Sequence, residues 1–389
     1  MNKNAFRILL GLGVVGLIAG SVGMWARLQY GHAPMAYGSY VPWGLWVAFD
    51  LIFLGLTAGA WIIVLLTYGF GRKQFERLGP VAVLTLLVSL LCEGIIISLD
   101  LGQPMRVYRF LVTPSFTSML TWLVVCITAM WLIYLPMFYF LLRGKFAKAG
   151  ADAEKDKYRA IVRILALINI PVGLAFFAVQ GAFFAVMLNR PLWSSALAPV
   201  LFLAAAFLSG GALVTAMAAI FDRDKVVFTP LARIVLALLA VFLLLEAVQF
   251  FIGYQSNSPG TAAALNMIAF GPNWWAFWIV HILIGSLVPL LLLLFRPGDS
   301  RSVAWACLLI VITFLAVRYN AVVPDLAAYN LEGLDNYFVH PRLSQAYVPS
   351  LYEWLVSLWV VSLWVVVFLL GTKWLPVIPA EKGGEQHVA

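Results

Sequence analysis

Five ionisable or amide side chains lie inside long apolar stretches of this sequence, where an unpaired charge costs several kcal/mol. Each lies seven or eight positions from one end of its stretch: Asp50, Glu93, Gln180, Glu246 and His281. At a helical rise of 1.5 Å per residue, all five are about 10–12 Å below one surface. Such a belt of residues can transfer protons toward the interior, or it can hold helices together by hydrogen bonds.

Two spacings extend this belt toward the surface. Glu93 and Asp100 are seven residues apart, so they share a helix face, with Asp100 at the surface and Glu93 beneath it. Glu246, Gln249 and Gly253 share a face in the same way. The candidate proton pathway therefore comprises Asp50, Glu93, Gln180, Glu246, Gln249 and His281.

The stretches that carry these residues are long enough to cross a bilayer. Hydrophobic residues make up 63% of the 389 residues and charged residues 11%, whereas roughly a quarter are charged in soluble domains. Ten runs predict membrane-spanning helices: 7–26, 43–70, 80–101, 116–142, 160–188, 195–221, 231–254, 273–295, 302–323 and 351–372. We expect an all-α polytopic membrane protein whose first run is a retained helix and not a cleaved signal peptide.

The distribution of Lys and Arg predicts the orientation in the cytoplasmic (inner) membrane, because positive residues near span ends stay on the cytoplasmic side. With the N-terminus inside, the inner segments contain 17 Lys and Arg and the outer loops contain five. We therefore expect both termini in the cytoplasm. The net charge of +8 follows from this topology and does not indicate nucleic-acid binding.

A weak internal repeat predicts the arrangement of the spans. The second span runs from Trp43 to the small residues 58–60, and the sixth runs from Trp193 to the small residues 209–212. Each is followed by a span with one buried Glu. We expect two four-helix bundles related by a pseudo-two-fold axis along the membrane normal, although close packing of small residues alone produces the same pattern.

The chain is expected to divide into four units. Residues 1–42 form the first helix and an outer loop, 43–188 the first bundle, 189–323 the second bundle, and 324–389 an outer loop, the last helix and a cytoplasmic tail. The outer loop 324–350 is rich in aromatic residues and is expected to be a packed cap or a docking surface.

Residues that hold redox cofactors are scarce. Cys92, Cys126 and Cys307 all lie within spans and have no cluster-binding spacing, so we expect no iron–sulfur cluster and no metal in this chain. Of four histidines only His281 lies within a span, whereas a membrane haem usually needs axial histidines that face one another. We therefore expect no haem.

Several motifs occur in the order found in one family. The sequence resembles the NrfD/PsrC-like membrane subunits, of the polysulfide reductase type, at three segments: 43–60, the stretch 99–106 with 114–118, and the C-terminal stretches 318–324 and 347–354. Gln103 stands where that family usually has Arg. The last segment is similar to the ten-span branch, which includes membrane subunits of hydrogenase, Dsr and Hmc-type complexes and of a quinone-reductase complex.

The resemblance implies a quinone-reactive subunit of a respiratory oxidoreductase complex, with menaquinone as the expected quinone. It implies an iron–sulfur partner subunit docked on the outer (periplasmic) face, together with further subunits and membrane lipid. The expected quinone-binding residues are His32, Tyr40, Trp43, Asp100, Arg106 and Tyr108. Asp100 comes from the family motif, and His32 comes from its position and chemistry. Alternatively, His32 is a solvated loop residue, and Asp100 forms an ion pair with Arg106.

Two other functions are compatible with the residues. Parallel repeats and buried ionisable groups also occur in secondary transporters and in proton-conducting subunits without quinone chemistry. A purely structural anchor for a partner is the third possibility, and the buried carboxylates count against it. The belt lies toward one surface, whereas a transporter usually has broken helices around a site at the midplane.

Overall fold

Ten long helices dominate the computed structural model, which describes residues 3–146, 152–329, 333, 340, 343 and 345–377. Each of these helices is long and apolar enough to cross a membrane, which confirms the predicted ten-span all-α fold. No strand occurs among these residues. Tyr337 and Phe338 of the aromatic outer loop lie outside the described residues.

The spans follow the chain in order. They are α1 (Lys3–Tyr30), α2 (Leu45–Val64) continued by η1 (Leu65–Gly69), α3 (Gly79–Asp100), α5 (Met119–Phe146), α6 (Asp152–Ala185), α7 (Ala198–Met217) continued by η4 (Ala218–Asp222), α8 (Lys225–Gln255), η5 (Ala276–Leu287) continued by α10 (Val288–Phe295), α11 (Ser300–Ala327) and α12 (Leu351–Trp374). Four short elements connect them: η2 (Lys73–Phe75), η3 (Pro104–Arg106), α4 (Arg109–Val112) and α9 (Pro259–Phe270).

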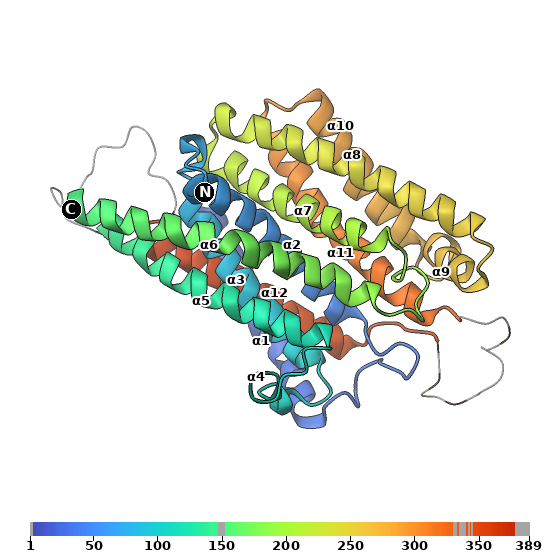
Figure 1. Cartoon of the computed structure of the whole chain (residues 1–389). Helices are drawn as coiled ribbons and strands as arrows, with labels where there is room; N and C mark the ends of the chain where they lie inside the picture. Colours follow the sequence, from blue (N-terminus) through green and yellow to red (C-terminus); the bar gives the residue numbers. More distant parts are fainter. Residues whose placement is uncertain are drawn as a thin grey trace.

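Two groups of four spans make up most of the molecule. In the first, α2 packs along α3 and α5 packs along α6, and in the second α7 and α10 pack against α8 and α11. The groups meet where α2 packs along α7 (Figure 1). A two-fold axis that exchanges α2 with α7 also exchanges α11 with α6. The packing of α2 on α11 and of α7 on α6 agrees with this relation.

Small residues make the central contact between α2 and α7 possible. A Cβ atom on Gly59 would lie 2.0 Å from the carbonyl carbon of Gly210, and one on Gly55 would lie 2.2 Å from Ser209 Oγ. The small clusters seen in the sequence therefore face each other. The indoles of Trp43 and Trp193 also stack, with ring centroids 5.9 Å apart. Corresponding residues of the two groups thus meet at their interface.

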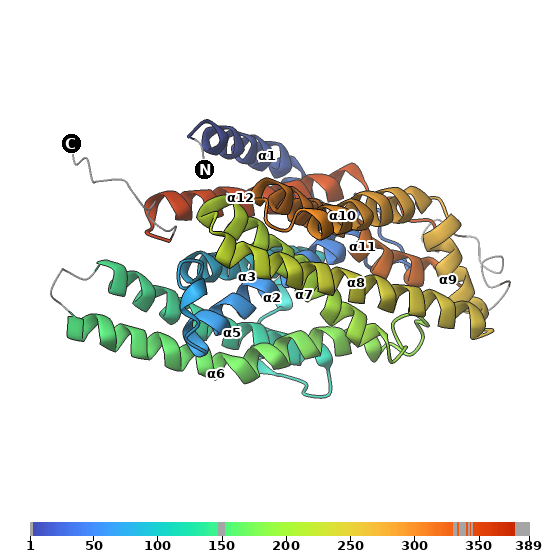
Figure 2. The same cartoon turned by 90° about the horizontal axis from the view of Figure 1, so that it is seen from above.

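The first and last spans form a pair at the side of the first group. Figure 2 shows α1 beside α12 along one side of the molecule, with α5 and α6 along the opposite side. Four glycines on one face of α1 would each clash with α12 if they carried a Cβ: Gly13, Gly16, Gly20 and Gly23. In turn, α12 packs on α3, where Trp364 Nε1 donates to Ser89 Oγ at 2.9 Å.

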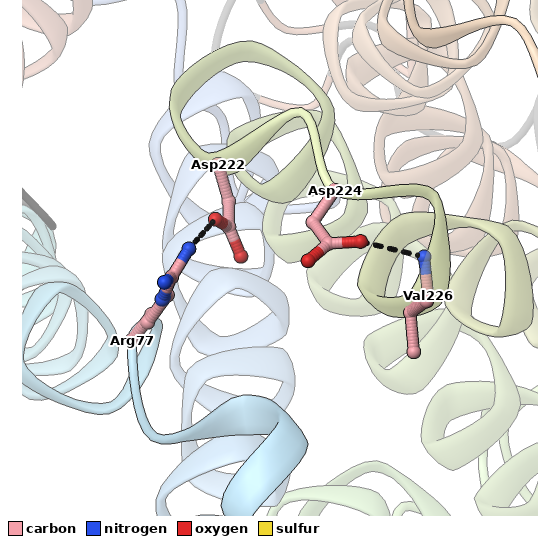
Figure 3. A network of polar contacts seen from close by, with 4 residues as sticks. All are labelled: Arg77, Asp222, Asp224 and Val226. Carbon is pink, nitrogen blue, oxygen red and sulfur yellow. Dashed lines mark hydrogen bonds and ion pairs between the residues drawn. The ribbon is translucent and has the colours of Figure 1, made fainter. Parts of the chain in front are cut away.

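An ion pair joins the two groups at the end of the molecule where α1 begins and α12 ends (Figure 1). Arg77, between η2 and α3, donates to Asp222 Oδ1 at the end of η4 over 3.2 Å (Figure 3). Two residues further on, Asp224 caps α8 by accepting a hydrogen bond from the backbone N–H of Val226 at 3.0 Å. The turn between η4 and α8 is therefore held from both sides.

Candidate functional site

A cavity of about 150 Å³, named here the first cavity, lies within the first group of spans. Four of the predicted polar residues line it, together with the indole of Trp43: Asp50 from α2, Glu93 and Asp100 from α3, and Gln180 from α6. Its remaining walls are apolar and include Leu120, Leu123, Phe176, Phe183 and Phe184. The structure thus brings carboxylates from two helices into one apolar chamber.

Glu93 and Gln180 form a direct contact across the first cavity. Gln180 Nε2 donates to Glu93 Oε1 at 3.3 Å, while Glu93 Oε2 is buried without a hydrogen-bond partner among the described residues. Glu93 and Asp100 both line the cavity, as their seven-residue spacing predicts. A buried carboxyl with one free oxygen can accept or release a proton without breaking its contact to Gln180.

Above the cavity, Asp100 belongs to a second set of residues, named here the outer polar cluster: Arg27, His32, Tyr37 and Asp100. Arg27, in the last turn of α1, donates from Nε to the Leu99 carbonyl at 2.6 Å and from Nη2 to the Leu101 carbonyl at 2.7 Å. These carbonyls end α3, where a cation is favoured by the helix dipole. Arg27 therefore anchors α1 to the end of α3, and it places a positive charge beside Asp100.

The alternative interpretation of Asp100, an ion pair with Arg106, is wrong. Asp100 is buried at the end of α3, whereas Arg106 is exposed in the short turn η3, and no ion pair joins the two. The backbone becomes extended at Leu101 and leads η3 away from the cavity. Tyr108, which follows, is 56% exposed. Neither Arg106 nor Tyr108 lines the first cavity.

His32 and Tyr37 lie next to each other on the outer side of Asp100. Their ring centroids are 5.4 Å apart, and His32 Nε2 lies 3.4 Å from the Leu99 carbonyl. Burial and the nearby Arg27 charge lower the pKa of His32, so the imidazole is neutral at pH 7. Because a carbonyl can only accept, this contact assigns the ring proton to Nε2 and leaves Nδ1 as an acceptor.

Tyr37 provides a hydroxyl beside Asp100. Burial and the Asp100 charge raise the pKa of Tyr37 well above its ordinary value, so the phenol keeps its proton. The two groups are not aligned as a hydrogen bond: Tyr37 Oη and Asp100 Oδ1 are both buried without a partner among the described residues. The outer polar cluster therefore offers a hydroxyl donor and a carboxyl acceptor that are free to bind another group.

A buried carboxylate that the sequence reasoning did not assign, Glu353, holds the loop after α1 in place. Its Oε1 accepts from the backbone N–H of Ala36, and its Oε2 accepts from the Tyr347 hydroxyl, both at 2.6 Å. Tyr347 Oη in turn accepts from the backbone N–H of Leu45 at 2.8 Å.

Tyr40, an expected site residue, is half-buried against the core and does not line the first cavity.

The second group of spans contains a smaller cavity of about 60 Å³, named here the second cavity. Glu246 and Gln249 of α8 line it, as expected for residues on one helix face. Glu246 Oε2 lies 3.5 Å from Nε2 of His281 on η5. Gly253 lies on the same face and packs against Leu265 of α9. Five of the six expected pathway residues therefore line one of the two cavities, and His281 lies beside Glu246 outside the lining of both.

Arg318 of α11 is the functional candidate that sequence reasoning missed, although it belongs to the C-terminal motif. It is 1% exposed and lines the second cavity. Its Nε and Nη2 have no hydrogen-bond partner among the described residues, and its guanidinium carbon lies 5.3 Å from the Phe314 ring centroid. Arg318 lies on α11, which also packs against α2, the helix that carries Asp50 of the first cavity.

Comparison with known proteins gives matches over most of the chain. The family model described as "Polysulphide reductase, NrfD" matches residues 35–327. A selenate reductase subunit of Mesobacillus selenatarsenatis is 28% identical, over 98% of this chain and 96% of the relative. The Hdr-like menaquinol oxidoreductase integral membrane subunit of Archaeoglobus fulgidus is 24% identical, over 90% of this chain and 88% of the relative. The menaquinone reductase integral membrane subunit of Nitratidesulfovibrio vulgaris is 23% identical, over 97% and 88%.

Proposed function

Since the chain belongs to the NrfD family of integral membrane proteins, we propose that it is the quinone-reactive membrane subunit of an oxidoreductase complex. Its substrate is membrane quinone, with menaquinone favoured because two relatives carry menaquinone or menaquinol in their names. Electrons pass between the quinone and an iron–sulfur partner subunit. This chain supplies the quinone pocket and the proton-exchanging groups.

The observation that carries the proposal is the first cavity. An apolar cavity of roughly 150 Å³ admits a benzene-sized ring, and the first cavity has a volume of about 150 Å³. Its walls suit an isoprenoid-bearing ring, while Asp100 and the Glu93–Gln180 pair provide polar contacts within it. Apolar walls with a few converging polar groups are the general pattern of small-molecule sites.

Proton exchange is the chemistry that these residues can perform. Oxidation of a quinol releases two electrons and two protons, and reduction of a quinone takes up the same numbers. Asp100 exchanges one proton with the outer polar cluster, where His32 Nδ1 is an acceptor and Tyr37 a donor. The free Oε2 of Glu93 exchanges the other proton deeper in the cavity.

A route onward from the first cavity supports a further role in proton translocation. Asp50 lines the first cavity, Arg318 lines the second, and their helices α2 and α11 pack against each other. Glu246 and His281 lie beyond it, 3.5 Å apart. Arg318 does not carry the proton itself in this scheme. Its fixed positive charge attracts the carboxylate of Asp50 and so couples the two chambers.

The proposed location of the partner follows from the position of the first cavity. Asp100 ends α3 and Arg27 lies in the last turn of α1, so the outer polar cluster lies at the end of the molecule opposite the start of α1 and the end of α12. With the termini in the cytoplasm, as the charge count predicts, this end is periplasmic in the inner membrane. The iron–sulfur subunit then docks on that face, within electron-transfer reach of the quinone.

Replacing Asp100 by Asn tests the proposed site, because Asn preserves size but cannot exchange a proton. Loss of a general acid–base group typically costs about 10²–10⁴-fold in rate. We expect quinone turnover of the purified complex to fall by about 10²-fold or more, with unchanged assembly. The matched control is Asp156→Asn, an exposed carboxylate at the opposite end. An assembled Asp100→Asn complex with normal turnover would remove Asp100 from the mechanism.

A further inference from the structure

A third cavity, larger than the first and second cavities, lies far from the candidate quinone site. It has a volume of about 410 Å³ and lies where η1 and η2 face the ends of α5 and α6, at the end of the molecule where α1 begins and α12 ends. It is named here the basic pocket. Its charged lining residues are Lys73, Glu76, Lys145, Lys155, Arg159 and Arg163.

Positive charge dominates the basic pocket, with five cations and one carboxylate in its lining. Three of the five cations already have partners. Lys155 and Arg159 form ion pairs with carboxylates of their own helix, over 3.8 and 3.3 Å. Lys145 Nζ donates to the Pro376 carbonyl at 2.6 Å. Lys73 and Arg163 have no ion-pair partner among the described residues. These two cations remain available to an anionic ligand.

Apolar surface adjoins these cations. Tyr68, Phe140 and Val162 line the same pocket. On α6, one and four residues beyond Arg163, Ile164 and Leu167 are 56% and 41% exposed, so they face the lipid. The pocket thus combines an anion-binding rim with an apolar strip that continues into the bilayer.

We propose that the basic pocket binds the phosphate headgroup of an anionic phospholipid, such as phosphatidylglycerol or cardiolipin. Lys73 and Arg163 contact the phosphate, and the acyl chains lie along Ile164 and Leu167 of α6. Basic pockets between spans at the membrane surface are the usual sites for such headgroups. A water-soluble phosphate compound would make no use of the exposed apolar strip, and a zwitterionic lipid would make little use of the excess positive charge.

The site has a structural consequence for the first group of spans. The pocket is formed by the end of α2 with its continuation η1, the turn η2, and the facing ends of α5 and α6. A bound lipid would bridge these elements at the end opposite the first cavity. The proposal does not depend on the quinone chemistry, since no residue is shared between the two sites.

The test compares the wild-type complex with Lys73→Gln/Arg163→Gln, using Arg296→Gln/Arg301→Gln as a matched pair of exposed cations on the second group. Lipid binding is measured by native mass spectrometry with cardiolipin, phosphatidylglycerol, phosphatidylcholine or inorganic phosphate. Near a membrane surface each basic residue contributes roughly fivefold in affinity, so the double variant should bind anionic lipid roughly 30-fold more weakly.

The matched pair should bind anionic lipid as the wild type does. Three outcomes would each overturn the proposal. The wild type could bind phosphatidylcholine as tightly as the anionic lipids, or inorganic phosphate at the same concentration could displace the lipid. The matched pair could also lose as much affinity for anionic lipid as Lys73→Gln/Arg163→Gln does. Because Lys73 and Arg163 are exposed, both variants should fold, and a thermal melting curve of each complex checks this directly.

Discussion

Asp100 is the residue shared by the first cavity and the outer polar cluster. One side of its environment is the apolar chamber with Glu93, and the other contains Arg27 and Tyr37. A carboxyl in this position can receive a proton from a bound molecule and pass it outward. Arg27 limits the cost of its burial by placing a cation nearby, while Arg27 itself is satisfied by two carbonyls of the α3 terminus.

Replacing Glu93 by Gln separates proton transfer from structure. The new side chain can still accept the hydrogen bond from Gln180 Nε2, so assembly and quinone binding should be retained. Proton uptake coupled to turnover should fall, because an amide does not titrate. Reconstituted vesicles with a pH-sensitive dye give the measurement. Retained coupling in Glu93→Gln would show that Glu93 serves only to hold α3 against α6.

For single residues, the sequence predicts which side chains share a helix face, but it does not predict contacts between residues far apart in the chain. Helical periodicity correctly places Glu93 and Asp100 on one face, because seven residues make about two turns. Arg27, Arg318 and Glu353 have no such local signal. Arg27 contacts a carbonyl 72 residues away, and Glu353 contacts an N–H 317 residues away. Such partners depend on how the helices assemble, which is why the alternative ion pair between Asp100 and Arg106 is wrong.

Among the elements, α1 depends on glycine for its close contact with α12. A Cβ on Gly20 would lie 2.7 Å from the Leu355 carbonyl oxygen and 2.8 Å from Trp359 Cα, which are backbone atoms of α12 that cannot rotate away. Gly20→Ala should therefore separate α1 from α12 and lower stability by about 1–3 kcal/mol, as overpacking does. Thermal unfolding in detergent measures this.

The same substitution at Gly11 is the control for α1. Gly11 has nothing within 4 Å of an added Cβ, so Gly11→Ala removes backbone freedom without a clash. We expect Gly11→Ala to be neutral or slightly stabilising. Equal melting temperatures for the Gly11 and Gly20 variants would mean that α1 is not docked on α12 in the purified protein.

Span positions were predictable because a bilayer imposes one length and one solvent on every span. All ten predicted runs correspond to observed spans. Irregular elements were not predictable in the same way. The π-helical η5 and the short helix α9 arise from packing in the second group, and the apolar run 273–295 contains no signal that distinguishes a π-helix from an α-helix.

For the whole molecule, orientation in the membrane is the main testable property. Cys92, Cys126 and Cys307 are buried, so a single introduced cysteine can report on accessibility. With a membrane-impermeant maleimide, Thr117→Cys should be labelled in intact spheroplasts, and Lys157→Cys only after the membrane is opened. Both positions are exposed and lie at opposite ends of the molecule. The reverse pattern would place both termini and the basic pocket outside.

The pairing of α1 with α12 has a consequence for biosynthesis. The glycine face of α1 packs on α12, and the other eight of the ten described spans lie between these two helices in the sequence. Until α12 emerges, that face of α1 has only lipid beside it. Synthesis and insertion of α12 are therefore the events that lock α1, and with it Arg27, onto the end of α3. The proposed quinone site would mature only once α12 has been inserted.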